Sequence, residues 1–108
     1  MYIADGKTNG PAFSWPDGKR IAVMVTFDYD AEFLRISRAK SKGTAIGFTD
    51  FSRGQYGPHE GLARCLDMLD TMNIKSTFFV PGAVIETYRD TVEEIHRRGH
   101  ELACHGYR

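Results

Sequence analysis

Three short apolar segments, separated by stretches with helical signals, restrict what this chain can fold into. They span residues 21–27, 74–80 and 101–105, and the first two are followed directly by charged or turn-forming residues. The first segment is continuous and partly β-branched, which is typical of a strand buried on both faces of a parallel sheet. The sequence therefore predicts three short strands, with the first and the last of them buried.

Two helices are expected between these strands. The first is predicted to run from Gly57, where a proline and an acid lie in the first turn, to Asn73. Its apolar stripe consists of Leu62, Cys65, Leu66, Leu69 and Met72. The second is predicted to run from the cap-like Asp90 to Gly99. Its apolar stripe consists of Tyr88, Val92 and Ile95.

The order of these elements indicates the fold class. Residues 31–56 show no clean period and are expected to form a long loop, which in a compact domain is usually functional or mobile. The resulting order of strand, loop, helix, strand, helix and strand is typical of parallel βαβ units, so we expect an α/β fold. Residues 1–20, rich in Gly, Pro and Asp, are expected to form an arm ahead of one domain over residues 21–108.

Composition excludes several classes of function. Fourteen basic residues balance fourteen acidic ones, which removes the electrostatic footprint of a protein that binds nucleic acid or a membrane surface. The expected partner is small or uncharged overall. No apolar run has the length of a signal peptide core or a membrane span, so a cytoplasmic location is expected. Cys65 and Cys104 are expected to be free thiols that behave as small hydrophobes, without a disulfide framework.

Asp28, Asp30 and His105 follow or end predicted strands, and reactive groups of parallel α/β folds gather at the carboxyl ends of strands. Two carboxylates two residues apart repel each other unless a cation or a proton lies between them. One of them can bind a metal while the other takes a proton from water, and a neutral imidazole on a strand end is a common metal ligand. The alternative for a single Asp is that it only caps a turn, but the pair together with His105 favours a site.

A second candidate site lies in residues 52–57, which combine glycines with Arg53 and Tyr56. The backbone amides near Gly57 could bind an anionic or carbonyl oxygen at a helix amino end. The alternative is a turn that only positions the helix. The scattered basic residues of the predicted loop are by default a solvated face, and His59, His96 and His100 are expected in solvated or capping roles.

The motifs resemble those of a known family. Residues 26–30 (TFDYD), 75–82 (KSTFFVPG) and 98–107 (RGHELACHGY) are similar, in order and spacing, to the motifs of the NodB-homology polysaccharide deacetylases. The resemblance covers residues 21–108 and implies the amino-terminal βαβαβ portion of a distorted (β/α) barrel of the glycoside hydrolase/deacetylase type. It also implies that Asp28 is the catalytic base, that Asp30 and His105 are metal ligands, and that the cofactor is a divalent metal, most simply zinc.

The sequence also departs from the family pattern. The two acids are usually adjacent and followed by Gly and Pro, whereas here Tyr29 separates them and Ala31 follows Asp30. This departure, with residues 53–57, is similar to an intracellular branch that includes peptidoglycan-deacetylase-like proteins and metal-independent allantoinases. That branch forms homo-oligomers, so self-association is expected, and it places a second His four residues after the position of His105. Arg53, Tyr56 and Gly57 are the expected substrate-binding residues.

The length of the chain bears on what it can do by itself. A complete barrel of related architecture needs roughly 250 residues, and the later family motifs are absent, so an amino-terminal fragment is expected. The first expectation for function is metal-dependent removal of an acetyl group from an N-acetylated carbohydrate, acting on a small-molecule or oligosaccharide substrate. The alternatives are an allantoinase-like ring-opening amidohydrolase and a non-catalytic remnant.

Overall fold

Three parallel strands form the centre of the structure, a computed structural model that describes residues 14–107. They are β1 (Thr26–Asp28), β2 (Thr77–Val80) and β3 (Glu101–Cys104), and they lie side by side in that order. Phe27 is in register with Phe78, which is in register with Leu102. All three strands therefore end at one edge of the sheet, as the sequence predicted.

The first strand is shorter and more exposed than the sequence predicted. Residues 21–25 are outside β1, and the side chains of Ile21, Val23 and Met24 are 74%, 78% and 88% exposed. The reason is that β1 pairs only with β2 among residues 14–107, so no second neighbour covers this apolar run. The prediction of a buried last strand fails for the same reason, because β3 also lies at an edge and Cys104 is exposed.

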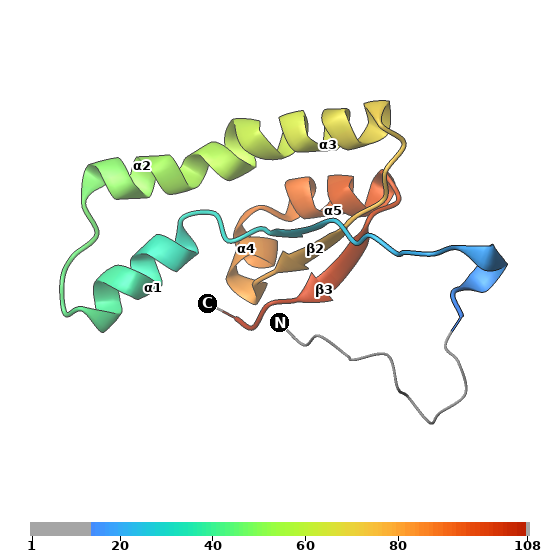
Figure 1. The fold of residues 1–108 in the computed structure, drawn as a ribbon. Helices are drawn as coiled ribbons and strands as arrows, with labels where there is room; N and C mark the ends of the chain where they lie inside the picture. Colours follow the sequence, from blue (N-terminus) through green and yellow to red (C-terminus); the bar gives the residue numbers. More distant parts are fainter. Residues whose placement is uncertain (1–13, 108) are drawn as a thin grey trace, which may run out of the picture.

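Helices cover one face of the sheet (Figure 1). α3 (Leu62–Thr71) and α5 (Arg89–Arg97) lie on the same side of the strands, and the predicted stripes supply the core. The buried core residues are Tyr29, Leu62, Leu66, Leu69, Phe78, Val80, Val84, Val92 and Ile95. Met72, predicted as part of the α3 stripe, is exposed. Two of the residues on the opposite face of β2, Thr77 and Phe79, are only half-buried.

Two helices occupy the segment that was predicted to be a loop. They are α1 (Phe33–Ser41) and α2 (Phe48–Tyr56), which form a hairpin at one end of the molecule (Figure 1). α1 has no buried residue, and the only buried residue of α2 is Gly54. The helices were missed because neither carries the buried apolar stripe by which a helix is recognised in a sequence.

Gly57 does not begin a helix as predicted, because α2 and α3 are joined by a π turn (Gly57–Gly61) into one continuous helical run. The amide of Leu62 donates to the carbonyl oxygen of Gly57, five residues earlier. Pro58 lies inside this turn. A proline ring clashes with the carbonyl group four residues before it, and the wider π turn is a known way for a helix to absorb such a disturbance.

The remaining elements fix the two ends of the described chain. A short 3-10 turn (Pro16–Gly18) lies in the expected arm, whose described residues 14–20 are exposed, and residues 1–13 of that arm lie outside the described range. α4 (Gly82–Thr87) was not predicted, and its first amides donate to the carbonyl oxygens of Gly106 and Tyr107 at 2.9 Å. These bonds tie the segment after His105 to α4.

Among residues 14–107, no helix has the length and apolar character needed to cross a membrane.

Candidate active site

The alternation of side chains along an extended segment places Asp28 and Asp30 on the same side of the first strand. Tyr29, between them, points to the opposite, helix-covered side and is 6% exposed. Its amide still donates to the carbonyl oxygen of Phe79 at 2.9 Å, so the extended conformation continues past the last residue of β1. The two carboxylates therefore lie together on the face of the sheet that the helices leave open.

Tyr29 holds this acidic segment in place. Its hydroxyl group lies 2.8 Å from the side-chain oxygen of Thr91 on α5. Burial raises the pKa of the Tyr29 phenol to about 12, so the group stays neutral. The sequence identified Tyr29 only as a departure from the family pattern, and its anchoring role could have been inferred from a large apolar ring between two outward-pointing acids.

His105 and Asp30 meet at the end of the sheet. The backbone amide of His105 donates to the carbonyl oxygen of Val80 at 3.3 Å. The Nε2 atom of the His105 ring lies 3.5 Å from Oδ1 of Asp30. Two ligands of one tetrahedral zinc ion, each at about 2.0–2.2 Å from it, lie about 3.3–3.6 Å apart. The separation and the chemistry of these two donors therefore fit a shared divalent cation.

The same two residues fall short of a complete catalytic metal centre. Such centres usually have three protein ligands. Within residues 14–107, no group of three or more His, Cys, Asp or Glu side chains is placed to hold a metal ion. A catalytic metal held by Asp30 and His105 would therefore need at least one further ligand.

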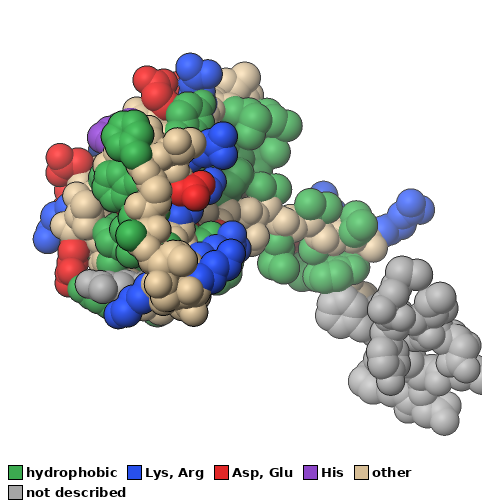
Figure 2. All heavy atoms as spheres, turned by 90° about the vertical axis from the view of Figure 1, so that its left-hand side faces the viewer, with side chains coloured by type: hydrophobic (Ala, Val, Ile, Leu, Met, Phe, Trp, Pro, Cys, Tyr) green, Lys and Arg blue, Asp and Glu red, His purple; other side chains and the backbone are tan. Residues whose placement is uncertain are grey.

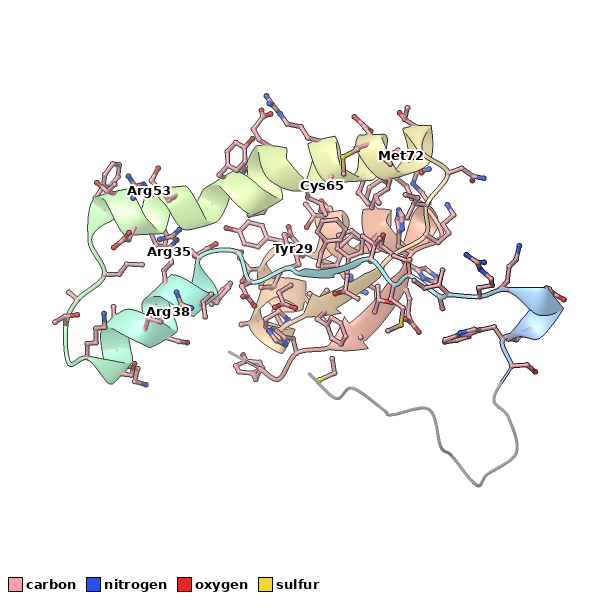
Figure 3. The ribbon with its side chains drawn as sticks, in the orientation of Figure 1. Tyr29, Arg35, Arg38, Arg53, Cys65 and Met72 are labelled. Carbon is pink, nitrogen blue, oxygen red and sulfur yellow. The ribbon has the colours of Figure 1, made fainter. Side chains whose placement is uncertain are left out.

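A groove of about 280 Å³ opens beside the carboxylates, between the end of β1 and the α1–α2 hairpin. It is lined by Asp28 and Asp30 on one side and by three arginines from the hairpin. Figure 3 shows these arginines, Arg35 and Arg38 on α1 and Arg53 on α2, at the same end of the molecule.

The structure separates the three residues that were expected to bind substrate. Arg53 and Gly57 line the groove. Tyr56 does not, and its ring packs against Gly61, where an added Cβ atom would lie 3.1 Å from Cε1 of the tyrosine. The expectation that residues 52–57 offer backbone amides at a helix amino end is wrong, because residues 52–56 lie inside α2 and residue 57 continues the helical run.

The wall of the groove depends on a close contact between α1 and α2. A Cβ atom added to Gly54 would lie 2.4 Å from Cα of Glu32, so only glycine permits this approach. Glu32 is buried, and its carboxylate accepts hydrogen bonds from the hydroxyl group of Tyr88 at 2.8 and 2.9 Å. The residue that begins the hairpin is thus fixed both to α2 and to the junction of α4 and α5.

His100 has a structural role that differs from the expected solvated or capping one. It is buried, its Nδ1 atom accepts a hydrogen bond from the amide of Ser76 at 3.2 Å, and its ring contacts Phe78 edge-on. Burial lowers the pKa of His100, which favours the neutral ring. Among the described residues, the histidine that pairs with one of the two carboxylates is His105.

Comparison with known proteins identifies the family. The profile of the family described as polysaccharide deacetylase matches residues 16–108. The chain belongs to this family. The resemblance of its three motifs is thereby confirmed, as is the expectation of an α/β fold that forms part of a deacetylase barrel.

Individual members of the polysaccharide deacetylase family are similar over most of the chain. The peptidoglycan deacetylase-like protein FGM2 of Gibberella zeae is 31% identical over 91 residues, which cover 82% of this chain and 26% of that protein. The peptidoglycan deacetylase of Helicobacter pylori is 36% identical over 58 residues, covering 54% of this chain and 20% of that protein. A crystal structure described as a polysaccharide deacetylase from Mycobacterium smegmatis superposes with a TM-score of 0.76 and 40% identity, covering 93% of this chain and 34% of that one.

The polysaccharide deacetylase relatives are much longer than this chain. The chain spans between a fifth and about a third of the length of those that it matches. The family match over residues 16–108 contains all three strands and both carboxylates described above. The similarity therefore concerns one portion of the deacetylase fold, the portion that carries Asp28, Asp30 and His105.

Proposed function

We propose that this chain contributes the Asp28, Asp30 and His105 portion of a metal-dependent active site that removes acetyl groups from N-acetylated carbohydrates. The observation that supports this proposal most directly is the 3.5 Å separation of His105 Nε2 and Asp30 Oδ1, next to a second carboxylate that lines the same groove as Asp30. Membership of the polysaccharide deacetylase family supports the choice of reaction.

The two carboxylates differ in their surroundings, which suggests different roles. Asp30 is paired with His105, and its side chain is 18% exposed. Asp28 is exposed, and its carboxylate has no hydrogen bond or ion pair among residues 14–107. A carboxylate that is free and open to the groove is able to accept a proton, whereas one that is already paired with an imidazole suits a ligand role.

The proposed reaction is the hydrolysis of an amide. Asp30 and His105 would hold the divalent cation, which when bound supplies Lewis-acid activation of the carbonyl group and of water. Asp28 accepts a proton as the oxygen of water forms a bond to the carbonyl carbon. The bond between that carbon and the amide nitrogen then breaks as the nitrogen takes up the proton that Asp28 had accepted, so that one water is consumed and acetic acid and an amine are released, which at neutral pH are acetate and an ammonium group.

Matched substitutions separate the two roles. In the full-length protein, Asp28→Asn should keep the bound metal and lose about 10²- to 10⁴-fold in kcat, whereas Asp30→Asn should lose both metal and turnover. Metal content is measured by elemental analysis, and turnover by acetate release from a chitin oligosaccharide. Asp17→Asn, an exposed aspartate in the 3-10 turn, is the matched control. Equal metal content and turnover in all of these proteins would contradict the assignment.

A second candidate activity is tested with the same proteins. The separated acids, with Tyr29 between them, are the feature that motivates a comparison with ring-opening amidohydrolases. Opening of allantoin without acetate release from the chitin oligosaccharide would replace the proposed substrate. Absence of both activities in a folded full-length protein would favour a non-catalytic role.

A further inference from the structure

Three arginines line the groove beside Asp28 and Asp30. Arg35 and Arg38 lie three residues apart on α1, and Arg53 faces the same groove from α2, so three guanidinium groups accompany two carboxylates. Figure 3 shows that the three come from the two arms of the hairpin, which brings them together although they are separated in the sequence.

Two of these arginines have no internal partner. Nη1 of Arg35 lies 3.2 Å from Oδ1 of Asp50. The side chains of Arg38 and Arg53 make no hydrogen bond or ion pair within residues 14–107. Neither groove carboxylate pairs with them, because Asp30 faces His105 instead. The guanidinium groups of Arg38 and Arg53 are therefore not engaged by a carboxylate of the described chain.

The arginines of α3 and α5, by contrast, are paired with carboxylates. Arg64 pairs with Glu60 at 3.5 Å, Arg89 with Glu93 at 2.8 Å and Arg97 with Glu94 at 2.7 Å. In each case the carboxylate lies one turn away along the same helical run, Glu60 being in the π turn that leads into α3. On the hairpin no such partner is provided for Arg38 and Arg53, which leaves both donors available to a ligand.

The positive charge continues beyond the first groove. A neighbouring hollow of about 280 Å³ between α1 and α2 shares Arg35 and Arg38 with it and adds Lys42, with Asp50 as its one acidic lining residue. Figure 2, which faces this end of the molecule, shows Lys and Arg side chains gathered over it. A negatively charged group that approaches the carboxylates from the hairpin side thus meets a basic surface first.

We propose that Arg38 and Arg53 bind a carboxylate or phosphate group carried by the substrate, close to the amide that is hydrolysed. This inference rests on the proposed function for the identity of the reaction. A guanidinium group presents a planar fork of N–H donors that matches the two oxygens of a carboxylate or phosphate. A groove of this size accepts about one sugar residue, so the anionic group and the amide belong to the same residue or to adjacent ones.

The chemical class that follows is an N-acetylated sugar acid rather than a neutral N-acetylated sugar. A neutral sugar would bring only hydroxyl groups to the guanidinium groups. A hydrogen bond from a guanidinium group to a neutral hydroxyl group is weaker than one to a carboxylate or phosphate, because in the latter both partners are charged. Arg35, held by Asp50, is expected to contribute less than the two unpaired arginines.

The test compares three probes with the full-length protein: N-acetylmuramic acid, its methyl ester and N-acetylglucosamine. The acid has a carboxylate on a lactyl ether, the ester has the same shape without the charge, and the third lacks the substituent. Binding is measured by calorimetry or by chemical-shift changes, and turnover by acetate release. We expect the acid to bind about 10- to 100-fold more tightly than the ester.

Arginine variants locate the site. Arg38→Ala and Arg53→Ala should each weaken binding of the acid about 10-fold or more, raise its KM with little change in kcat, and leave binding of the ester unchanged. Arg38→Lys should restore only part of the affinity, because an ammonium group lacks the fork. Arg64→Ala, which removes an exposed arginine on α3, is the control and should have no effect.

The outcomes distinguish this inference from the proposed function. Equal affinity for acid and ester, or insensitivity of the acid to Arg38→Ala and Arg53→Ala, would overturn the inference. Inorganic phosphate that binds at these arginines without competing with the acid would also overturn it, since the anion site would then lie apart from the substrate. Charge-selective binding without acetate release would leave the anion site standing and contradict the proposed deacetylation alone.

Discussion

The core layer, formed by α3, β2 and α5, differs from the α1–α2 hairpin in how its side chains are buried. In the core layer, Leu66, Leu69, Phe78 and Ile95 are at most 1% exposed. In the hairpin, Gly54 is the only buried residue of the two helices, and the contact that holds them is a backbone approach. The charges differ in the same way, since arginines are paired in α3 and α5 and partly unpaired in the hairpin. Stability of the fold and shape of the groove therefore depend on separate contacts.

Removal of the same side-chain atoms from the two regions should give the largest contrast. Leu66→Ala in α3 should lower the free energy of unfolding by about 2–5 kcal/mol, because it leaves a cavity in the core. Leu34→Ala in α1, where the side chain is 39% exposed, should lower it by less than about 1 kcal/mol. Denaturant unfolding measures both values. Similar losses would show that α1 is packed as firmly as α3.

Substitution of Gly54 should affect the hairpin more than the core layer. Gly54→Ala places a methyl group against the backbone of Glu32, which should cost about 1–3 kcal/mol and move α1 away from α2. Gly47→Ala is the control, since an added Cβ atom there meets nothing within 4 Å. Hydrogen exchange should speed up in α1 and α2 of the Gly54 variant, with α3 and β2 unchanged. Equal exchange in both variants would show that the close approach is not needed.

The smallest effect is expected at Tyr29, where the two regions meet. Tyr29→Phe removes one hydrogen bond and should cost about 1 kcal/mol, because the Thr91 hydroxyl group still donates to the carbonyl oxygen of Tyr88.

The titration of Tyr29 reports the burial of the same side chain. The pKa of its phenol is raised from 10.0 to about 12 in the folded protein, so the stabilisation is complete below pH 10 and is lost as the pH rises from 10 to 12. Absorbance titration should show that Tyr29→Phe removes a tyrosine that ionises near pH 12, whereas Tyr88, whose pKa is also raised by burial, remains. Loss of one that ionises near pH 10 instead would contradict the buried position of Tyr29.

The sequence predicted best where periodic side chains become buried. The stripes on α3 and α5, except for Met72, and the position of β3 were correct, because each depends on local spacing and on packing against β2. The apolar run 21–27 was overextended, since its burial requires a neighbouring strand that residues 14–107 do not supply. Spacing alone could not predict which edges of the sheet would be paired.

Part of the candidate site could likewise be predicted from local spacing, and part could not. Asp28, Asp30 and His105 could be placed from the sequence, because the ends of parallel strands meet at one edge. The opposite wall of the groove could not, because it depends on the contact between Gly54 and Glu32, which are far apart in the sequence and show no pattern of spacing. The amide site expected in residues 52–57 failed for this reason, as α2 was not recognised.

The π turn at Gly57–Gly61 determines which side chains of α2 line the groove. Such a turn takes up about one residue more than an α-helical turn, and each residue turns a helix by about 100°. The side chains of α2 are therefore rotated by about that angle relative to an uninterrupted continuation of α3. Insertion or deletion of a single residue at Pro58 would rotate α2 about its axis relative to α3. Arg53 would then point in a different direction, while the buried leucines of α3 would stay in place. Substrate preference in such a scaffold can diverge by changes in length rather than by changes in the residues that line the site.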